Sequence, residues 1–122
     1  MTIGEISAQT GLPESTLRYY ESKKLIKVSR DSGGRRDYAQ SDIEWVKFIQ
    51  RLKETGMRLK DIQRYADLRY AGDGTMPERL EMLRLHREYV LDQQNKWAEY
   101  LKNLDSKILF YQQSIRNKGA QI

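Results

Sequence analysis

Seven arginines and lysines stand within residues 18–36 of this 122-residue chain, against only two acidic residues. The excess in this window equals the entire formal net charge of +5, so the charge is focused in one segment. A focused cluster of cations attracts a polyanion and releases the counterions bound to it. A solvated basic face of a helix has the same composition. The elements that position these side chains must decide between the two interpretations.

Residues suited to catalysis or metal binding are few and badly spaced. The sequence has no cysteine, which excludes disulfides, zinc fingers, thiolate metal sites and thiol redox sensing within the chain. The single histidine, His86, has no accompanying Ser and Asp constellation. Asp61 and Asp67 do not share a helix face, and no glycine-rich phosphate loop joins a strand to a helix. We therefore expect neither an enzyme nor a bound cofactor or metal.

Length and composition predict one small domain with an appended helix. With 39% hydrophobic and 32% charged residues, the chain is polar but holds enough large apolar residues to fold. No stretch approaches the roughly 18 apolar residues of a membrane span, and the first residues lack the features of a signal peptide. We expect a cytoplasmic protein with a compact domain over residues 1–71, a glycine-containing linker over 72–77 and a coiled-coil helix over 78–118.

Three helix starts are marked by capping boxes, in which a Ser or Thr and a Glu three residues later satisfy free backbone N–H groups. They are Thr2-x-x-Glu5, Ser41-x-x-Glu44 and Thr75-x-x-Glu78. Pro13 suits the first turn of a further helix. These signals predict short helices over about residues 2–9, 13–24, 42–54 and 58–70. The first two, joined by a tight glycine-containing turn, would form a helix-turn-helix.

Between the two helix pairs, residues 25–40 (LIKVSRDSGGRRDYAQ) predict a two-stranded β-ribbon with arginines at its tip. A helix-turn-helix followed by such a ribbon is a winged arrangement. Its second helix fits the DNA major groove, and its wing reaches flanking phosphates or the minor groove. On the second helix, contacts to base edges and phosphates would come from Ser15, Thr16, Arg18 and Tyr19. We therefore interpret the basic window as a DNA-binding surface.

Residues 2–70 resemble the DNA-binding domain of the MerR family of bacterial transcription regulators. The motifs that carry the resemblance are IGEISAQTGLPESTLRYYESKKLI, RDSGGRRDY and TGMRLKDIQRY. In that family LRYYE lies on the recognition helix and GGRRDY belongs to the wing. The resemblance therefore assigns DNA-contact roles to Arg18, Tyr19, Arg35, Arg36 and Tyr38, and a phosphate contact at a helix start to Lys60. Members act as dimers that bend and untwist an over-long promoter spacer so that RNA polymerase can use it.

After the linker, apolar residues recur at alternating steps of four and three, the pattern of a coiled-coil seam. The seam residues expected at a dimer interface are Leu80, Leu83, Val90, Trp97, Leu101, Leu104 and Ile108. From residue 78 to 115 the helix would reach about 57 Å, too long for the small domain to cover, so a second copy is expected to pair with it. The alternative is a helix kinked back onto its own domain, but no Pro or Gly interrupts residues 78–118.

The expected fold is therefore mainly α, with a winged helix-turn-helix DNA-binding domain followed by a long dimerisation helix. The MerR resemblance implies that two such helices form an antiparallel coiled coil. A twofold homodimer of this kind would bind a palindromic operator on double-stranded DNA.

The effector mechanisms of three MerR subgroups cannot be carried over to this sequence. Metal-responsive members use cysteines near the start of the long helix, and drug-sensing members add a domain after it; neither feature occurs in these residues. RDSGGRRDY and IEWVKFIQRLKETGM are most similar to a thiol-based subgroup associated with aldehydes and other electrophiles, but Arg51 stands where that subgroup has its cysteine. Either an uncharged or anionic molecule binds a small pocket, or the protein works without an effector. The candidate lining residues are Tyr65, Tyr70, Tyr89 and Trp97.

A helical adaptor is the competing hypothesis. Its coiled coil would bind another protein, and its basic surface would bind nucleic acid without sequence preference. Arg18→Ala and Arg36→Ala should weaken DNA binding if the chain is a regulator.

Overall fold

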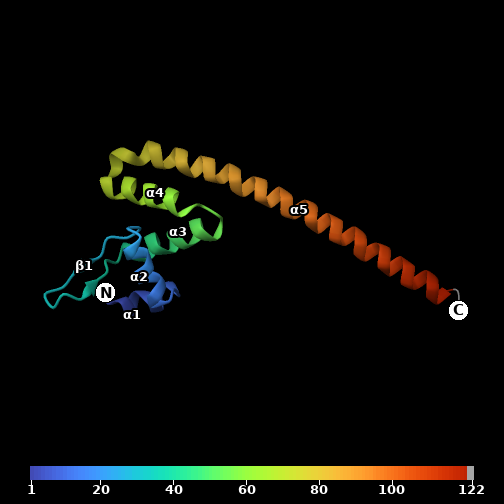
Figure 1. Ribbon diagram of the computed structural model, residues 1–122, viewed down its shortest axis with the longest axis horizontal. Helices are drawn as coiled ribbons and strands as arrows, with labels where there is room; N and C mark the ends of the chain where they lie inside the picture. The colour runs from blue at the N-terminus through green and yellow to red at the C-terminus, as the bar shows by residue number, and fades with distance from the viewer. Residues whose placement is uncertain (121–122) are drawn as a thin grey trace. The chain divides into compact units, whose positions relative to one another are not determined.

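The computed structural model describes residues 1–120 and divides into two compact units, one over Met1–Leu83 and one from Arg84 onward. We call the first unit the head. Its elements are α1 (Ile3–Thr10), α2 (Glu14–Ser22), β1 (Ser29–Arg30), β2 (Arg36–Asp37), α3 (Asp42–Glu54), α4 (Leu59–Ala71), the short 3-10 helix η1 (Asp73–Thr75) and the first turns of α5 (Met76–Ala120) (Figure 1). The remainder of α5 is the second unit. The predicted fold class, mainly helical with a small wing and a long last helix, is confirmed.

Helices α1 and α2 pack against each other across a tight turn, as a helix-turn-helix requires. Thr2 caps α1, because its hydroxyl oxygen accepts a hydrogen bond from the Glu5 N–H at 3.1 Å, so the helix start predicted at Thr2 is confirmed. α1 ends at Gly11, whose φ of 75° lies in the left-handed region that favours glycine. The Gly11 N–H donates to the carbonyl of Ser7 and closes the helix at 2.9 Å.

Strands β1 and β2 form the wing, an antiparallel ribbon in which Arg30 lies opposite Arg36. In Figure 1 the wing projects from the helical part of the head. Asp31 organises its tip: one carboxylate oxygen accepts hydrogen bonds from the N–H groups of Gly33 at 2.9 Å and Arg35 at 3.0 Å. A side chain that binds its own turn in this way fixes the loop that carries Arg35.

The ribbon is shorter than the predicted 25–40, because the start of that segment is drawn into the core of the head. Leu25 and Ile26 are buried outside either strand. The Leu25 carbonyl accepts a hydrogen bond from the Trp45 indole N–H at 3.0 Å. Two residues later, the Lys27 N–H donates a hydrogen bond to the Tyr70 hydroxyl at 3.0 Å. The base of the wing is thus fixed to α3 and α4.

Helix α3 has the predicted bounds, but the capping box predicted at Ser41 is wrong. Ser41 makes no side-chain cap. Instead the carboxylate of Asp42 accepts a hydrogen bond from the Ala39 N–H at 2.8 Å, and Asp42 is buried in doing so. The turn to α4 passes through Gly56 at a φ of 90°, in the left-handed region that favours glycine.

The core of the head is apolar and aromatic. Trp45 stacks on Tyr65 with ring centroids 5.8 Å apart, and Phe48 packs on Tyr65 at 5.7 Å. Burying each large side chain of this kind contributes about 1.5 to 3 kcal/mol to folding. The buried hydrophobic residues are Ile6, Leu12, Leu17, Tyr20, Leu25, Ile26, Tyr38, Ile43, Trp45, Val46, Ile49, Leu52, Ile62, Tyr65 and Ala66.

Helix α5 begins at Met76, directly after Thr75, where the sequence marks a helix start. The Thr75 hydroxyl donates to the carbonyl of Leu68 in α4 and so ties the two helices together. Met82 and Leu83 in the first turns of α5 pack against the core of the head. Among residues 1–120, no helix combines the length and apolarity needed to cross a membrane.

Candidate nucleic-acid interface

Helix α2 has one apolar face and one polar face. Leu17 and Tyr20 are buried in the core, at the spacing that places them on one side of the helix. The predicted contact residues occupy the remaining positions. Exposed or half-buried on α2 are Ser15, Thr16, Arg18 and Tyr19. The helix therefore offers hydroxyls, a guanidinium and a phenol to a partner.

Arg18 is held by a carboxylate on the preceding turn. Its Nη2 lies 3.1 Å from Oε2 of Glu14, and both side chains are about half exposed. Exposed pairs of this spacing stabilise a helix by only about 0.3 to 0.5 kcal/mol. Exchange of the Glu14 carboxylate for a phosphate or a guanine edge therefore costs little.

Two ammonium groups lie within about 6 Å of the Tyr19 ring. The residue is 39% exposed, and the Nζ atoms of Lys53 and Lys23 lie 4.9 Å and 5.8 Å from the ring centroid. Lys53 also lies 5.4 Å from the ring of Tyr20. Burial, with a smaller contribution from the Glu54 carboxylate, raises the pKa of Tyr20, so this phenol stays neutral. The lysines add positive charge beside the surface that α2 presents.

The three arginines of the wing differ in their exposure and in their ion pairs. Arg35 at the tip is exposed, and no carboxylate in residues 1–120 pairs with its guanidinium. Arg36 is 30% exposed and pairs through Nε with Glu21 of α2 at 3.2 Å. Arg30 pairs with the same carboxylate at 3.1 Å. The wing thus presents one unpaired cation, and the other two connect it to α2.

Tyr38, which the resemblance predicts to contact DNA, has its side chain buried in the head. Only 2% of Tyr38 is exposed, and its backbone N–H donates to the carbonyl of Met1 at 2.7 Å. Burial raises the pKa of the Tyr38 phenol, although the Arg36 guanidinium acts in the opposite direction. The ring is therefore a core residue beneath the wing, and its hydroxyl is not presented to solvent.

Lys60 is exposed in the first turn of α4, which starts at Leu59 after Gly56 and the extended Arg58. The free N–H groups of a helix start favour an anion, and a lysine there adds a full positive charge. This arrangement suits the phosphate contact predicted for Lys60.

The second unit exposes apolar side chains along most of α5. Trp97 is 70% exposed, and Leu101, Leu104 and Ile108 are each more than half exposed. Leu80 is also exposed and Val90 is half-buried, whereas Leu83 packs against the head. Exposed apolar surface of this extent marks an interaction site.

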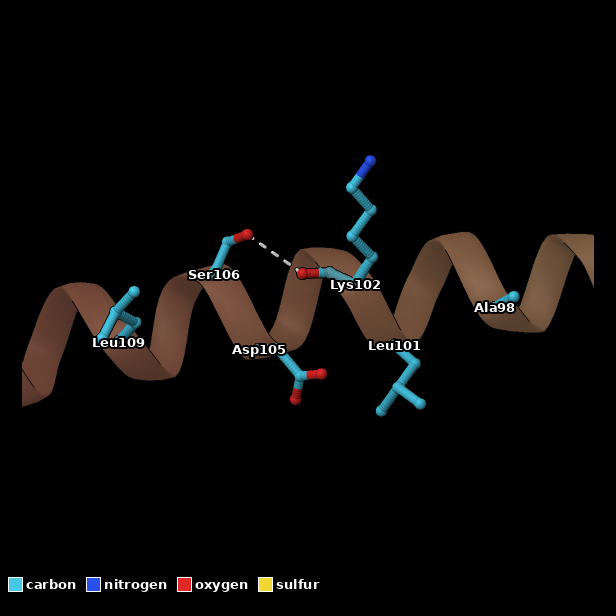
Figure 2. Close-up of a pocket in the computed structure, with 6 residues that line it drawn as sticks. All are labelled: Ala98, Leu101, Lys102, Asp105, Ser106 and Leu109. Carbon is cyan, nitrogen blue, oxygen red and sulfur yellow. Dashed lines mark hydrogen bonds between the residues drawn. The ribbon is translucent and has the colours of Figure 1, made fainter.

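A shallow depression along α5 is lined by this helix alone. Figure 2 shows Leu101, Asp105 and Leu109 with their neighbours on successive turns, and the Ser106 hydroxyl donating to the Lys102 carbonyl at 3.0 Å. Ligand sites are concave and enclosed by several elements. The depression therefore has the form of a helix surface and lacks the walls of a small-molecule site.

The four aromatic residues predicted to line an effector pocket have separate surroundings. Tyr65 lies in the core and Tyr70 binds the base of the wing. Tyr89 stacks on the ring of His86 with centroids 6.0 Å apart, and Trp97 is exposed. The effector pocket stays a prediction. Residues 1–120 contain no group of three or more His, Cys, Asp or Glu side chains that could hold a metal ion.

Comparison with known families decides what this surface belongs to. A family model described as "MerR HTH family regulatory protein" matches residues 1–68, which is more than half of the chain. The chain belongs to the MerR family. A second MerR model, described as "MerR, DNA binding", matches residues 43–107 and so extends the likeness into α5. The resemblance predicted from the sequence is confirmed, and the chain is a DNA-binding transcription regulator.

Relatives within the MerR family match most of the chain. A protein of Haemophilus influenzae described as an uncharacterized HTH-type transcriptional regulator is 36% identical over 93% of this chain and 84% of its own length. The crystal structure of HiNmlR, described as a MerR family regulator lacking the sensor domain and bound to promoter DNA, has a TM-score of 0.81. HiNmlR is 36% identical to this chain, and the match covers 92% of this chain and 90% of the HiNmlR chain. A putative MerR regulator from Listeria monocytogenes has a TM-score of 0.83 at 29% identity over 88% of this chain and 83% of its own.

These relatives are described as regulators, so the expectation that the chain is not an enzyme is confirmed and the adaptor hypothesis gains no support. The sequence interpretation of this MerR protein still missed two residues at the surface. Lys53 was missed because its contact with Tyr19 joins α3 to α2 across the fold. Glu21 was counted only as a charge in the basic window. Its one sequence signal is an acid directly after the paired tyrosines.

Proposed function

We propose that this MerR regulator binds a palindromic operator in a promoter spacer as a homodimer, and bends and untwists the DNA to control transcription by RNA polymerase in the cytoplasm. The observation that carries the proposal is the α2 surface. Arg18 and Tyr19 stand exposed on this helix, and the same helix is joined through Glu21 to a wing whose tip presents the unpaired Arg35.

In this proposal α2 enters the major groove. Arg18 exchanges the weak Glu14 pair for a guanine edge or a phosphate, and Ser15 and Thr16 contact base edges or phosphates. Arg35 reaches a flanking phosphate or the minor groove, and Lys60 at the start of α4 binds a phosphate. Tyr19 and its flanking lysines contribute to the backbone contacts, which set the register of the protein on the duplex.

The homodimer is supported by the long apolar surface of α5, which residues 1–120 leave exposed. The predicted antiparallel pairing would relate the two heads by a twofold axis, and a twofold protein matches a palindromic site. HiNmlR, which matches most of this chain, has been crystallised with promoter DNA, and this supports promoter binding by this chain.

The test is to incubate the purified protein with fragmented genomic DNA from its source at near-physiological salt and to sequence the fragments it retains. We expect enrichment of one inverted repeat between promoter elements with an over-long spacer. Arg18→Ala should abolish the enrichment, whereas Arg116→Ala on the exposed end of α5 removes the same charge and should leave it intact. Retention that is independent of sequence and vanishes at moderate salt would contradict the proposal.

A further inference from the structure

Two arginines from opposite strands of the wing converge on one carboxylate of the recognition helix. Nη2 of Arg30 lies 3.1 Å and 3.2 Å from the two carboxylate oxygens of Glu21. Nε of Arg36 lies 3.2 Å and 3.3 Å from the same two oxygens. The Glu21 side chain is only 20% exposed, less than either arginine. One side chain therefore joins α2, β1 and β2.

Within residues 1–120, Glu21 makes the ion pairs between the wing and α2, and β2 is also tied to the N-terminus, where the Met1 ammonium group lies 2.9 Å from Oδ1 of Asp37. The strands of the wing have two residues each, and its tip is closed by Asp31 from within the loop. An isolated surface ion pair contributes little, but a carboxylate shared by two guanidiniums and partly shielded from water is a network with a defined geometry. The angle between α2 and the wing is therefore expected to depend on Glu21.

Charge alone would predict the opposite role for this residue. Glu21 is an acid inside the basic window, and a negative charge near a polyanion weakens attraction to it. It also neutralises two of the cations that the sequence pattern assigned to DNA binding. If the wing acted only by its net charge, removing Glu21 should improve binding to every DNA sequence.

We propose that Glu21 is a positioning residue for specific DNA recognition, which holds the wing at a fixed angle to α2 through Arg30 and Arg36. The inference rests on the proposed function, because it assumes that α2 and the wing contact one operator together. Arg35 then acts as the wing's direct DNA contact. Arg36 acts mainly by holding the wing in place, and this role is possible only while Glu21 is present.

The test uses the full-length protein and two labelled duplexes of equal length, the fragment enriched from genomic DNA and a shuffled version of it. Fluorescence anisotropy gives the Kd of each duplex. We expect Glu21→Gln to weaken binding of the enriched fragment about fivefold or more, and to tighten binding of the shuffled duplex by up to about twofold. A purely electrostatic role would tighten both, and loss of folding would weaken both.

Glu44→Gln is the matched control, because Glu44 is 78% exposed on α3 and its only ion pair in residues 1–120 is with Lys47 at 3.9 Å. It removes the same charge without touching the wing, so both Kd values should move together or stay unchanged. In an Arg30→Ala/Arg36→Ala background, Glu21→Gln should no longer weaken binding of the enriched fragment, since the groups it acts through are gone.

Hydrogen exchange measures the positioning directly. Glu21→Gln should speed amide exchange at residues 29–37 while leaving α3 and the melting temperature of the head nearly unchanged. Unchanged wing exchange, or an equal Kd change on both duplexes, would overturn the inference while leaving the proposed function in place. If the wild-type protein distinguishes no fragment at all, the proposed function fails and the inference falls with it.

Discussion

Tyr38 is the residue at which the MerR pattern and the packing of this head differ most. Within residues 1–120, its phenol oxygen is the one buried side-chain nitrogen or oxygen that has no hydrogen-bond partner. A buried hydroxyl without a partner costs free energy relative to water. The ring is nevertheless retained in the core, next to the strand that carries Arg36. The hydroxyl therefore makes no hydrogen bond that stabilises the fold, and its removal tests its role.

Replacing Tyr38 with Phe should leave the free energy of unfolding unchanged or raise it by up to about 1 kcal/mol, because an unpaired polar atom is removed from the core. Urea unfolding followed by circular dichroism measures this change. The affinity for the enriched DNA fragment should stay within about twofold, because the hydroxyl is not presented to a ligand. A large loss of affinity without loss of stability would restore the direct DNA contact that the family resemblance assigned to Tyr38.

The buried phenols also predict how stability depends on pH. Burial raises the pKa of both Tyr20 and Tyr38 above the ordinary value of 10.0. The neutral phenols therefore stabilise the fold in full below pH 10, and this contribution is lost as the pH rises through the folded-state pKa values. Melting temperatures measured from pH 8 to pH 11 should fall at the alkaline end, and the fall should be smaller in Tyr38→Phe. Tyr100→Phe, at an exposed position of α5, should follow the wild type.

At the scale of elements, the sequence predicts what local chemistry determines. The Thr2 cap and the glycine turn between α1 and α2 follow from neighbouring residues, and the structure has both. The length of the ribbon was mispredicted, because Leu25 is held by Trp45 and Lys27 by Tyr70. These partners are distant in sequence or lie on another element. The Glu21 network is of the same kind, since no local sequence pattern shows that Glu21 pairs with Arg30 and Arg36.

Gly11 tests one of the local predictions. Its φ of 75° is unfavourable for a residue with a side chain, and no atom lies within 4 Å of where a Cβ would stand. Gly11→Ala should therefore destabilise the head by about 1 kcal/mol through backbone strain alone. Gly74→Ala is the control, because that position has equal space and no left-handed φ, and its effect should stay within about 0.5 kcal/mol. Equal effects in urea unfolding would argue against the backbone explanation.

At the scale of the whole molecule, the two units differ in how they bury apolar surface. The head has a closed core, whereas α5 from Arg84 onward is a single helix with its large apolar residues exposed. Helices in water gain most of their stability from packing an apolar face. The spacing of Trp97, Leu101, Leu104 and Ile108 fits a coiled-coil seam, and we therefore expect the second copy to supply this packing.

Leu104→Glu should weaken the dimer at least tenfold, because it places a charge in an apolar seam where it cannot be solvated. Sedimentation equilibrium would detect the monomer, and the affinity for the palindromic fragment should fall with it. Asn103→Glu, on the neighbouring position outside the seam, should remain dimeric. A Leu104→Glu protein that stays dimeric at micromolar concentration would exclude this seam as the interface.

The orientation of the two helices determines where the DNA-binding heads lie, and introduced cysteines can read it because the chain has none of its own. Disulfides form only when the two Cβ atoms approach about 3.5 to 4.5 Å. In a parallel pair each seam residue faces its own copy, so Val90→Cys, Leu101→Cys and Ile108→Cys should all crosslink. In the antiparallel pair only residues beside the twofold axis meet their own copies. We therefore expect oxidised dimers on a non-reducing gel for no more than one of the three variants. Crosslinking at all three would place both heads at one end and would rule out the predicted antiparallel pairing.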